Sequence, residues 1–337
     1  MEDVKTIASK LVQAGKGILA ADESMETAGE RFAVIGVENS EEARRRYREL
    51  FIGTPGIHAW MSGIILHDET VSQHMADGRP FLDVLHAEGI LLGVKVDEGK
   101  EPDPNSPEET VTKGLESLHG RLPTYAKRGI SFAKWRAVIR VGELLPTLDN
   151  IERQCADLAQ FARACVENAM VPICEPEVLM NGNHSIERAG NVAIATLMAL
   201  FAALERAGVD PAYIILKTSM VIPGKEFALG KATPEQVAEE TLRALQVVVP
   251  KNIGGVVFLS GGQGAIEATQ NLAAICSRGA PWPMSFSFAR ALQEPTLLAW
   301  NGEDANLDHA RAVFVKRLRL NAIATQGAYA RDLEDKP

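Results

Sequence analysis

The sequence predicts an α/β fold, a single (β/α)8 TIM barrel that spans residues 1–337 as one domain. The first observation is a series of eight short apolar runs, which are typical of strands buried on both faces. The second is that segments with helical spacing of apolar residues alternate with these runs. The third is the spacing. The runs end near residues 22, 67, 95, 134, 175, 217, 260 and 287, so each interval can hold a right-handed crossover. A doubly wound open sheet is the alternative, but no GxGxxG motif follows the first run.

The elements follow from the same pattern. Strands are predicted at residues 18–21, 63–66, 90–94, 130–133, 171–174, 213–217, 255–259 and 284–286. Helices are predicted at residues 5–12, 40–51, 81–86, 112–128, 147–169, 185–207, 233–249, 266–276 and 310–324. The helix at 233–249 opens with Thr233, Pro234 and Gln236, which are residue types of a helix start. Residues 98–109 are rich in proline and acid and are predicted to be a surface loop, and the polar segment 328–337 a short flexible tail.

Composition narrows the class of function. The net charge of −9 argues against nucleic acid or an anionic membrane as a partner. No run of about 18 apolar residues is present, and the first residues carry no secretory signal, so we expect a cytoplasmic protein. The four cysteines form no CxxC pair and are expected to be buried, reduced thiols. The histidines His67, His74 and His184 show no ligand spacing, so core or surface positions are expected for them, with no metal and no cofactor.

The run Tyr213–Lys217 ends a predicted buried strand with a lysine. Desolvation and neighbouring cations favour the neutral amine of a lysine, and a neutral amine can attack a carbonyl to form a Schiff base. Taken alone, the run also fits a lysine that reaches out to solvent from the end of a strand.

Other predicted strands also end in reactive or charged residues. They are Asp22, Lys95, Lys134, Glu175 and Ser260. Active sites of (β/α)8 barrels lie at the carboxyl ends of the strands, so we expect these side chains to converge at one mouth. Cations gathered there in an acidic protein indicate an anionic small substrate.

Two groups of residues could each bind a phosphate. Ser260, Gly261 and Gly262, with Ser287 and Arg290, follow the seventh and eighth strands, where barrels place a phosphate site. The two glycines also fit a plain tight turn. Ser24, Thr27 and Arg31 after the first strand, together with Lys95 and Arg136, could hold a second phosphate, which suggests a bisphosphate.

The motifs LAADES, GVKVDEG, FAKWR, VPICEPEVL, ILK, FLSGGQ and FSFARAL stand in this order between about Gly15 and Gly327. In this, the sequence resembles the class I fructose-1,6-bisphosphate aldolases. The resemblance implies a metal-independent lyase of glycolysis and gluconeogenesis that reversibly cleaves fructose 1,6-bisphosphate to dihydroxyacetone phosphate and glyceraldehyde 3-phosphate. It also suggests a homotetramer.

The resemblance further implies residue roles. Lys217 matches the lysine that forms the Schiff base, and Glu175 matches the acid and base that assists loss of water. A structural ion pair is the alternative for Glu175. Asp22 matches the carboxylate that accepts or donates the proton of the substrate's 4-hydroxyl. Lys134 matches a cation beside Lys217, and Glu177 matches a supporting carboxylate. Ser260, Gly261, Ser287 and Arg290 match the 1-phosphate side, and Ser24, Lys95 and Arg136 the 6-phosphate side.

The sequence departs from the family at three points. Thr218-Ser219 replaces Pro-Asn after the lysine, Phe288-Ala289 replaces Tyr-Gly before Arg290, and the longer tail that ends in tyrosine is absent. Without that tyrosine, another group must protonate the carbon of the enamine intermediate that remains after the aldehyde leaves. Glu175 is the candidate. A Schiff-base enzyme for another phosphosugar, a preference for fructose 1-phosphate, and a sugar-phosphate binding protein without turnover stay open as alternatives.

Overall fold

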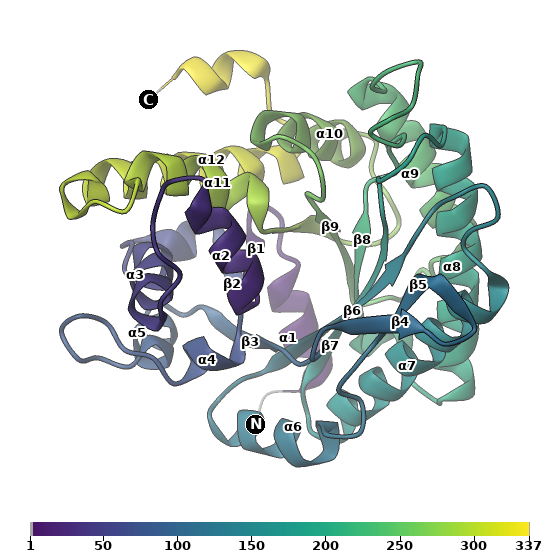
Figure 1. Cartoon of the computed structure of the whole chain (residues 1–337), viewed down its shortest axis with the longest axis horizontal. Helices are drawn as coiled ribbons and strands as arrows, with labels where there is room; N and C mark the ends of the chain where they lie inside the picture. Colours follow the sequence, from purple (N-terminus) through teal and green to yellow (C-terminus); the bar gives the residue numbers. More distant parts are fainter. Residues whose placement is uncertain (1–2, 337) are drawn as a thin grey trace.

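The computed structural model describes residues 3–336 and shows a closed barrel of eight parallel strands surrounded by helices (Figure 1). The strands are β1 (Gly17–Ala21), β2 (Met61–Leu66), β3 (Leu91–Lys95), β6 (Phe132–Ile139), β7 (Val171–Val178), β8 (Ile215–Ser219), β9 (Gly255–Leu259) and β10 (Met284–Phe288). They pair in chain order, and β10 closes the ring on β1. The (β/α)8 prediction is therefore confirmed, and an open sheet is excluded.

Twelve α-helices lie among the described residues, and several of them begin at a side-chain cap. They are α1 (Val4–Leu11), α2 (Met25–Ala33), α3 (Glu41–Ile52), α4 (Asp68–Val71), α5 (Phe81–Ala87), α6 (Leu118–Lys127), α7 (Leu148–Glu167), α8 (Ile186–Arg206), α9 (Pro234–Val248), α10 (Ala265–Ser277), α11 (Arg290–Trp300) and α12 (Leu307–Thr325). The side chains of Ser40, Thr147 and Ser185 each accept the backbone N–H three residues ahead, which satisfies an otherwise unpaired donor. Thr233 and Gln236 form the predicted reciprocal capping box.

The interior of the barrel is filled below the mouth. Ile65, Phe132 and Ile215 pack there against Ile7 and Leu11 of α1, which closes the amino-terminal end of the barrel. A Cβ at Gly93 would lie 2.1 Å from the Phe132 ring, so this position has no room for a side chain. Because the lower end is closed by apolar packing, the carboxyl ends of the strands are left to form the polar end.

The region predicted as a surface loop forms an antiparallel hairpin of β4 (Lys100–Asp103) and β5 (Ser106–Thr112) (Figure 1). The Asp103 carboxylate, fully buried, accepts hydrogen bonds from Asn150 at 2.8 Å and Arg153 at 3.0 Å. Glu109, also buried, accepts from the Thr147 hydroxyl at 2.6 Å. Most of this stretch lies on the surface as predicted, but it is a hairpin and not a loop, and two of its carboxylates are buried because α7 and its cap residue supply partners.

Several boundaries also differ. α6 begins at Leu118 instead of residue 112, because Thr112 belongs to β5. The short helix α2 and the helix α11 were not predicted. Residues Pro211–Tyr213 form a 3-10 helix, so β8 starts at Ile215 and continues past Lys217 to Ser219. β6 and β7 likewise continue beyond Lys134 and Glu175.

The carboxyl-terminal segment is anchored rather than free. Residues Arg331–Asp335 form a 3-10 helix, and Glu334 makes an ion pair with Arg317 of α12 at 2.7 Å, with both side chains buried (Figure 1). The Tyr329 hydroxyl donates to the same carboxylate at 2.9 Å. Glu334 thus holds this segment against α12, and the flexibility expected of residues 328–337 stays a prediction. Pro337 lies outside the described residues.

One helix, α8, is long and apolar enough by composition to cross a membrane. It packs against α7 and α9 on the outside of the barrel, and about 44% of its most apolar window is buried. A core helix of a barrel has the same composition, so this feature alone says little about a membrane.

Candidate active site

A cavity of about 980 Å³ opens at the carboxyl ends of the strands. It is lined by nearly all of the predicted site residues, namely Asp22, Ser24, Thr27, Arg31, Lys95, Lys134, Arg136, Glu175, Glu177, Lys217, Ser260, Gly261, Ser287 and Arg290. Gly262 does not line it. The expectation that these side chains converge on one mouth is therefore met, although Lys134, Glu175 and Lys217 lie within strands and not at their ends.

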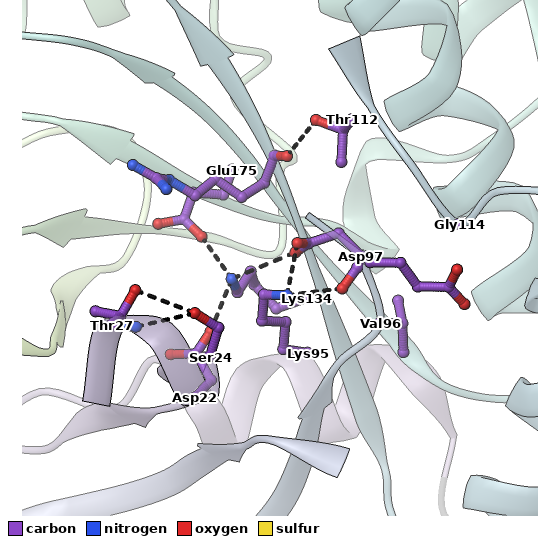
Figure 2. Close-up of polar contacts among 12 residues, drawn as sticks. Asp22, Ser24, Thr27, Lys95, Val96, Asp97, Thr112, Gly114, Lys134 and Glu175 are labelled. Carbon is purple, nitrogen blue, oxygen red and sulfur yellow. Dashed lines mark hydrogen bonds and ion pairs between the residues drawn. The ribbon is translucent and has the colours of Figure 1, made fainter. Parts of the chain in front are cut away.

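The centre of the cavity is an alternating cluster of lysines and carboxylates (Figure 2). Lys134 Nζ lies 2.7 Å from Asp22 Oδ2 and 3.3 Å from Glu175 Oε2. Lys217 Nζ lies 3.1 Å from the other oxygen of Glu175, Oε1. Glu175 thus bridges the two lysines. All four residues come from strands of the barrel wall or from the residue after β1, so the fold itself fixes their spacing.

These groups are almost completely buried. The side chains of Lys134, Lys217 and Glu175 are 3–5% exposed. Burial acts to raise the pKa of the Asp22 carboxyl, but the neighbouring lysine charges, Lys134 foremost, outweigh burial and hold that pKa well below its usual range. Burial acts to lower the pKa of Lys134, and the charges of Asp22 and Glu175 instead raise it well above its usual value. Lys134 is therefore a fixed cation and Asp22 a fixed anion.

A second pair lies further up the same wall. Arg136 Nε donates to Glu177 Oε2, and the Arg136 side chain is 40% exposed towards the cavity. Burial acts to lower the pKa of the guanidinium, and the charges of Glu177 and Glu175 raise it. A Cβ at Gly261 would lie 3.0 Å from Glu177 Oε1, so Glu177 also packs against the loop after β9.

The residues after β1 are largely engaged with each other. Ser24 caps α2 by accepting the backbone N–H of Thr27 at 3.2 Å, and the two hydroxyls lie 3.1 Å apart. Arg31 is paired with the buried carboxylate of Glu23, which also binds Arg48 at 2.5 Å. Arg31 still lines the cavity, but in the free protein it is already held by the carboxylate that it shares with Arg48.

Across the barrel from β3 and β6, the segments around the ends of β9 and β10 present unpaired donors. Ser260 and Gly261 precede α10, and Ser287, Ala289 and Arg290 lead into α11. The Ser287 hydroxyl is buried without a hydrogen-bond partner, and Arg290 is exposed. We call these five residues the anion loops. Helix N-termini and free hydroxyls are suited to bind a phosphate. Gly262 has a φ of +70°, and a Cβ there would overlap the Met180 sulfur, so its role is the tight turn.

The chain matches known proteins over almost its whole length. Residues 3–337 match the family model "Glycolytic: Fructose-bisphosphate aldolase class-I". The chain belongs to the class I fructose-bisphosphate aldolase family. The class I enzymes are the metal-independent lyases that cleave fructose 1,6-bisphosphate, and this places the chain among the enzymes, not among binding proteins without turnover.

Individual relatives cover almost the whole chain. A fructose-bisphosphate aldolase of Dictyostelium discoideum is 46% identical over 97% of this chain and 93% of its own. A probable class 1 fructose-bisphosphate aldolase of Xanthomonas axonopodis pv. citri is 44% identical over 98% of this chain and 99% of its own. The crystal structure of the Plasmodium falciparum aldolase, solved with TRAP and an inhibitor, matches with a TM-score of 0.95 and 43% identity over 97% of this chain and 95% of that one.

Three residues of this aldolase cavity were missed or misjudged from the sequence. Asp97 contacts both Lys95 and Lys134, although it stands in the quoted motif GVKVDEG. Glu23 stands in LAADES and anchors Arg31. His67 was expected in the core or on the surface, but it lines the cavity. Position relative to a strand end is the signal that was available for all three, since each follows a barrel strand within two residues.

The His67 ring is held in a defined orientation. Its Nδ1 accepts the backbone N–H of Glu69 at 3.3 Å as the cap of α4, which leaves Nε2 to carry the proton of the neutral ring. Burial and the nearby charges of Lys95 and Arg48 lower the pKa of the imidazole. Among the described residues, no group of three His, Cys, Asp or Glu side chains is arranged to hold a metal ion.

Proposed function

We propose that Lys217 is the nucleophile of this aldolase and that Glu175 is its proton partner. The observation that carries the proposal is the 3.1 Å contact between Lys217 Nζ and Glu175 Oε1 inside a buried cluster. A lysine amine attacks the carbonyl carbon of the open-chain substrate, and the resulting carbinolamine must lose water. A carboxyl group at hydrogen-bond distance from the amine supplies and receives the protons of these two steps.

Asp22 starts the cleavage step. Because its pKa is held well below the usual range, the carboxylate is ionised and can accept the proton of the substrate's 4-hydroxyl. The carbon–carbon bond then breaks, and its electron pair moves to the iminium nitrogen on Lys217, which gives an enamine. Lys134 stabilises the negative charges of Asp22 and Glu175 throughout. Glu175 returns a proton to the enamine carbon, after which water releases the second product.

The two phosphates of the substrate occupy opposite sides of the mouth. The anion loops bind the 1-phosphate through the Ser287 hydroxyl, the backbone at Gly261 and the Arg290 guanidinium. Lys95, Arg136 and Ser24 bind the 6-phosphate, with Thr27 and Arg31 behind them. Glu177 supports Arg136 from the other side.

The test is chemical trapping. Dihydroxyacetone phosphate and borohydride should label Lys217 in the wild type, as read by mass spectrometry of peptides, while excess EDTA leaves turnover of fructose 1,6-bisphosphate unchanged. The Lys217→Met variant should lose both turnover and labelling. Lys127→Met, on the exposed end of α6, is the matched control and should keep both. Labelling at another lysine, or inhibition by EDTA that a divalent metal reverses, would overturn the assignment.

We further propose that the enzyme is cytoplasmic and a homotetramer that binds neither nucleic acid nor a membrane. The names of plant relatives support the first point, such as "Fructose-bisphosphate aldolase 6, cytosolic" of Arabidopsis thaliana, which is 46% identical over 94% of this chain. Fractionation of cells tests the cytoplasmic location, and sedimentation equilibrium tests the homotetramer. Steady-state kinetics with fructose 1,6-bisphosphate and fructose 1-phosphate tests the preference for the bisphosphate.

A further inference from the structure

Two lysines of the cavity wall stand directly opposite each other. Lys95 of β3 and Lys134 of β6 are paired Cα positions in the parallel ladder, and both side chains reach the cavity. Like charges on opposed strand positions destabilise a sheet, and burial strengthens the repulsion because little water screens it. The arrangement therefore requires an anion near both ammonium groups.

Asp97 supplies this anion. The ladder continues one residue past β3, since Val96 N–H donates to the Lys134 carbonyl at 3.0 Å, and the Val96 side chain is buried in the core. Side chains alternate along an extended chain, so Asp97 returns to the cavity side with Lys95. Asp97 Oδ1 lies 2.7 Å from Lys95 Nζ, and Oδ2 lies 3.7 Å from Lys134 Nζ (Figure 2).

The contacts with Lys95 fix the direction of its ammonium group. Lys95 Nζ donates to the Asp97 carbonyl at 2.7 Å and forms an ion pair with the Asp97 carboxylate, also at 2.7 Å. A lysine ammonium has three donors, and the carbonyl uses one, so donors are left to bind a substrate anion. The Lys95 side chain is 15% exposed and the Asp97 side chain only 5%, so Asp97 holds the lysine from behind.

The same contacts keep Lys95 apart from the residues that are proposed to transfer protons. Lys134 is bound by Asp22 at 2.7 Å and Glu175 at 3.3 Å, whereas its contact with Asp97 is the longest of the three. Asp22 and Glu175 thus remain the ion-pair partners of Lys134 and Lys217. Loss of the Asp97 carboxylate would leave Lys95 with the Asp97 carbonyl alone, while Lys134 kept its two nearer carboxylates.

We propose that Asp97 is a positioning residue that directs the Lys95 ammonium towards the phosphate on carbon 6 and so favours the bisphosphate over fructose 1-phosphate. The inference rests on the proposed placement of the two phosphates. It assigns Asp97 to substrate selection, acting through Lys95, and not to the proton transfers at Lys217.

The experiment compares two substrates on one set of variants. Asp97→Asn keeps the size of the side chain and removes its charge. It should raise KM for fructose 1,6-bisphosphate at least tenfold and change KM and turnover for fructose 1-phosphate by less than threefold. Asp97→Glu, which keeps the charge but moves it, should give a smaller rise for the bisphosphate. Asp103→Asn removes an equally buried carboxylate outside the cavity and should leave the ratio of the two KM values unchanged.

A double-variant comparison tests the route through Lys95. In a Lys95→Met background, adding Asp97→Asn should raise KM for the bisphosphate by less than twofold. Equal losses with both substrates would overturn the proposal, as would an unchanged or lower KM for the bisphosphate in both Asp97 variants. A wild type that cleaves neither substrate would instead contradict the proposed function, so the two failures are distinguishable.

Discussion

The cavity has two sides that handle charge in opposite ways. On the strand side, each lysine of the buried cluster already has a carboxylate partner, as in Lys134 with Asp22 and Lys217 with Glu175. On the side of the anion loops, Ser287 has no partner and Arg290 is exposed. The strand side is thus complete before substrate arrives, whereas the loops are complete only when an anion is bound.

The difference follows from what each side must do. Groups that transfer protons need fixed distances, and barrel strands with paired charges provide them at a cost of desolvation. Groups that hold a phosphate need donors that are not already used. We therefore expect variants on the strand side to change turnover, the stability of the protein and the dependence of that stability on pH. Variants of the anion loops should change KM.

The largest expected effect concerns the support behind the anion loops. Arg317 donates to the carbonyl of Ala265, the first residue of α10, and Glu334 balances its charge. Deleting residues 332–337 leaves this buried arginine without its carboxylate, which should cost about 3 kcal/mol of unfolding free energy. Turnover of the folded enzyme should change by less than about threefold, because neither residue lines the cavity.

Urea unfolding and steady-state kinetics on the truncated protein check this expectation. Truncation after Asp335 keeps Glu334 and is the matched control, which should be as stable as the full chain. Detritiation of labelled dihydroxyacetone phosphate, which reports proton exchange at the enamine carbon, should also stay within threefold. A tenfold loss of turnover and of detritiation in a folded truncation would assign a proton transfer to this segment instead of Glu175.

The second effect is the dependence of stability on pH at the strand side. The folded-state pKa of Asp22 is depressed, so its contribution is present above the unfolded value of about 3.9 and is lost as pH falls through the lower folded value. Asp22→Asn should therefore be about 2 kcal/mol less stable than the wild type at pH 7. The gap should narrow as pH falls from 5 to 3.

Urea titrations at pH 7, 5, 4 and 3 measure the gap. Asp77→Asn, which removes an exposed carboxylate paired only with Arg79, is the control and should differ little from the wild type at each pH. Ser287→Ala, on the anion loops, should show no such dependence on pH. A gap between Asp22→Asn and the wild type that stays constant down to pH 3 would mean that Asp22 is not held ionised by the lysines.

The sequence predicted the barrel and most of this site because both depend on local pattern. Eight apolar runs are enough to place eight strands, and a charged residue after such a run points to the mouth. The ends of β6, β7 and β8 were missed for a physical reason. Lys134, Glu175 and Lys217 interrupt the apolar runs, yet their charges are satisfied by one another inside the barrel, so the strands continue past them.

What the sequence could not supply was pairing between distant segments. The burial of Asp103 depends on Arg153 and Asn150 of α7, and the anchoring of Glu334 depends on Arg317. In each case a polar residue was assigned to the surface because its partner lies elsewhere in the chain. Arg31 shows the converse, since it was assigned to substrate while Glu23 already holds it.

The smallest expected effect is at Ala289 in the anion loops, where the family has glycine. The residue has a φ of −102°, which alanine adopts without the strain of a left-handed conformation, so the backbone does not require glycine here. Its methyl group stands between the cavity and apolar neighbours of the barrel interior. Ala289→Gly should therefore lower KM for fructose 1,6-bisphosphate by less than about threefold, or about 0.6 kcal/mol, and leave turnover unchanged. Ala291→Gly, at the buried second residue of α11, is the control for added backbone freedom and should not lower KM. A rise in KM for Ala289→Gly would show that the methyl group orders the loop instead of crowding the phosphate, and the anion loops would then be as pre-organised as the strand side.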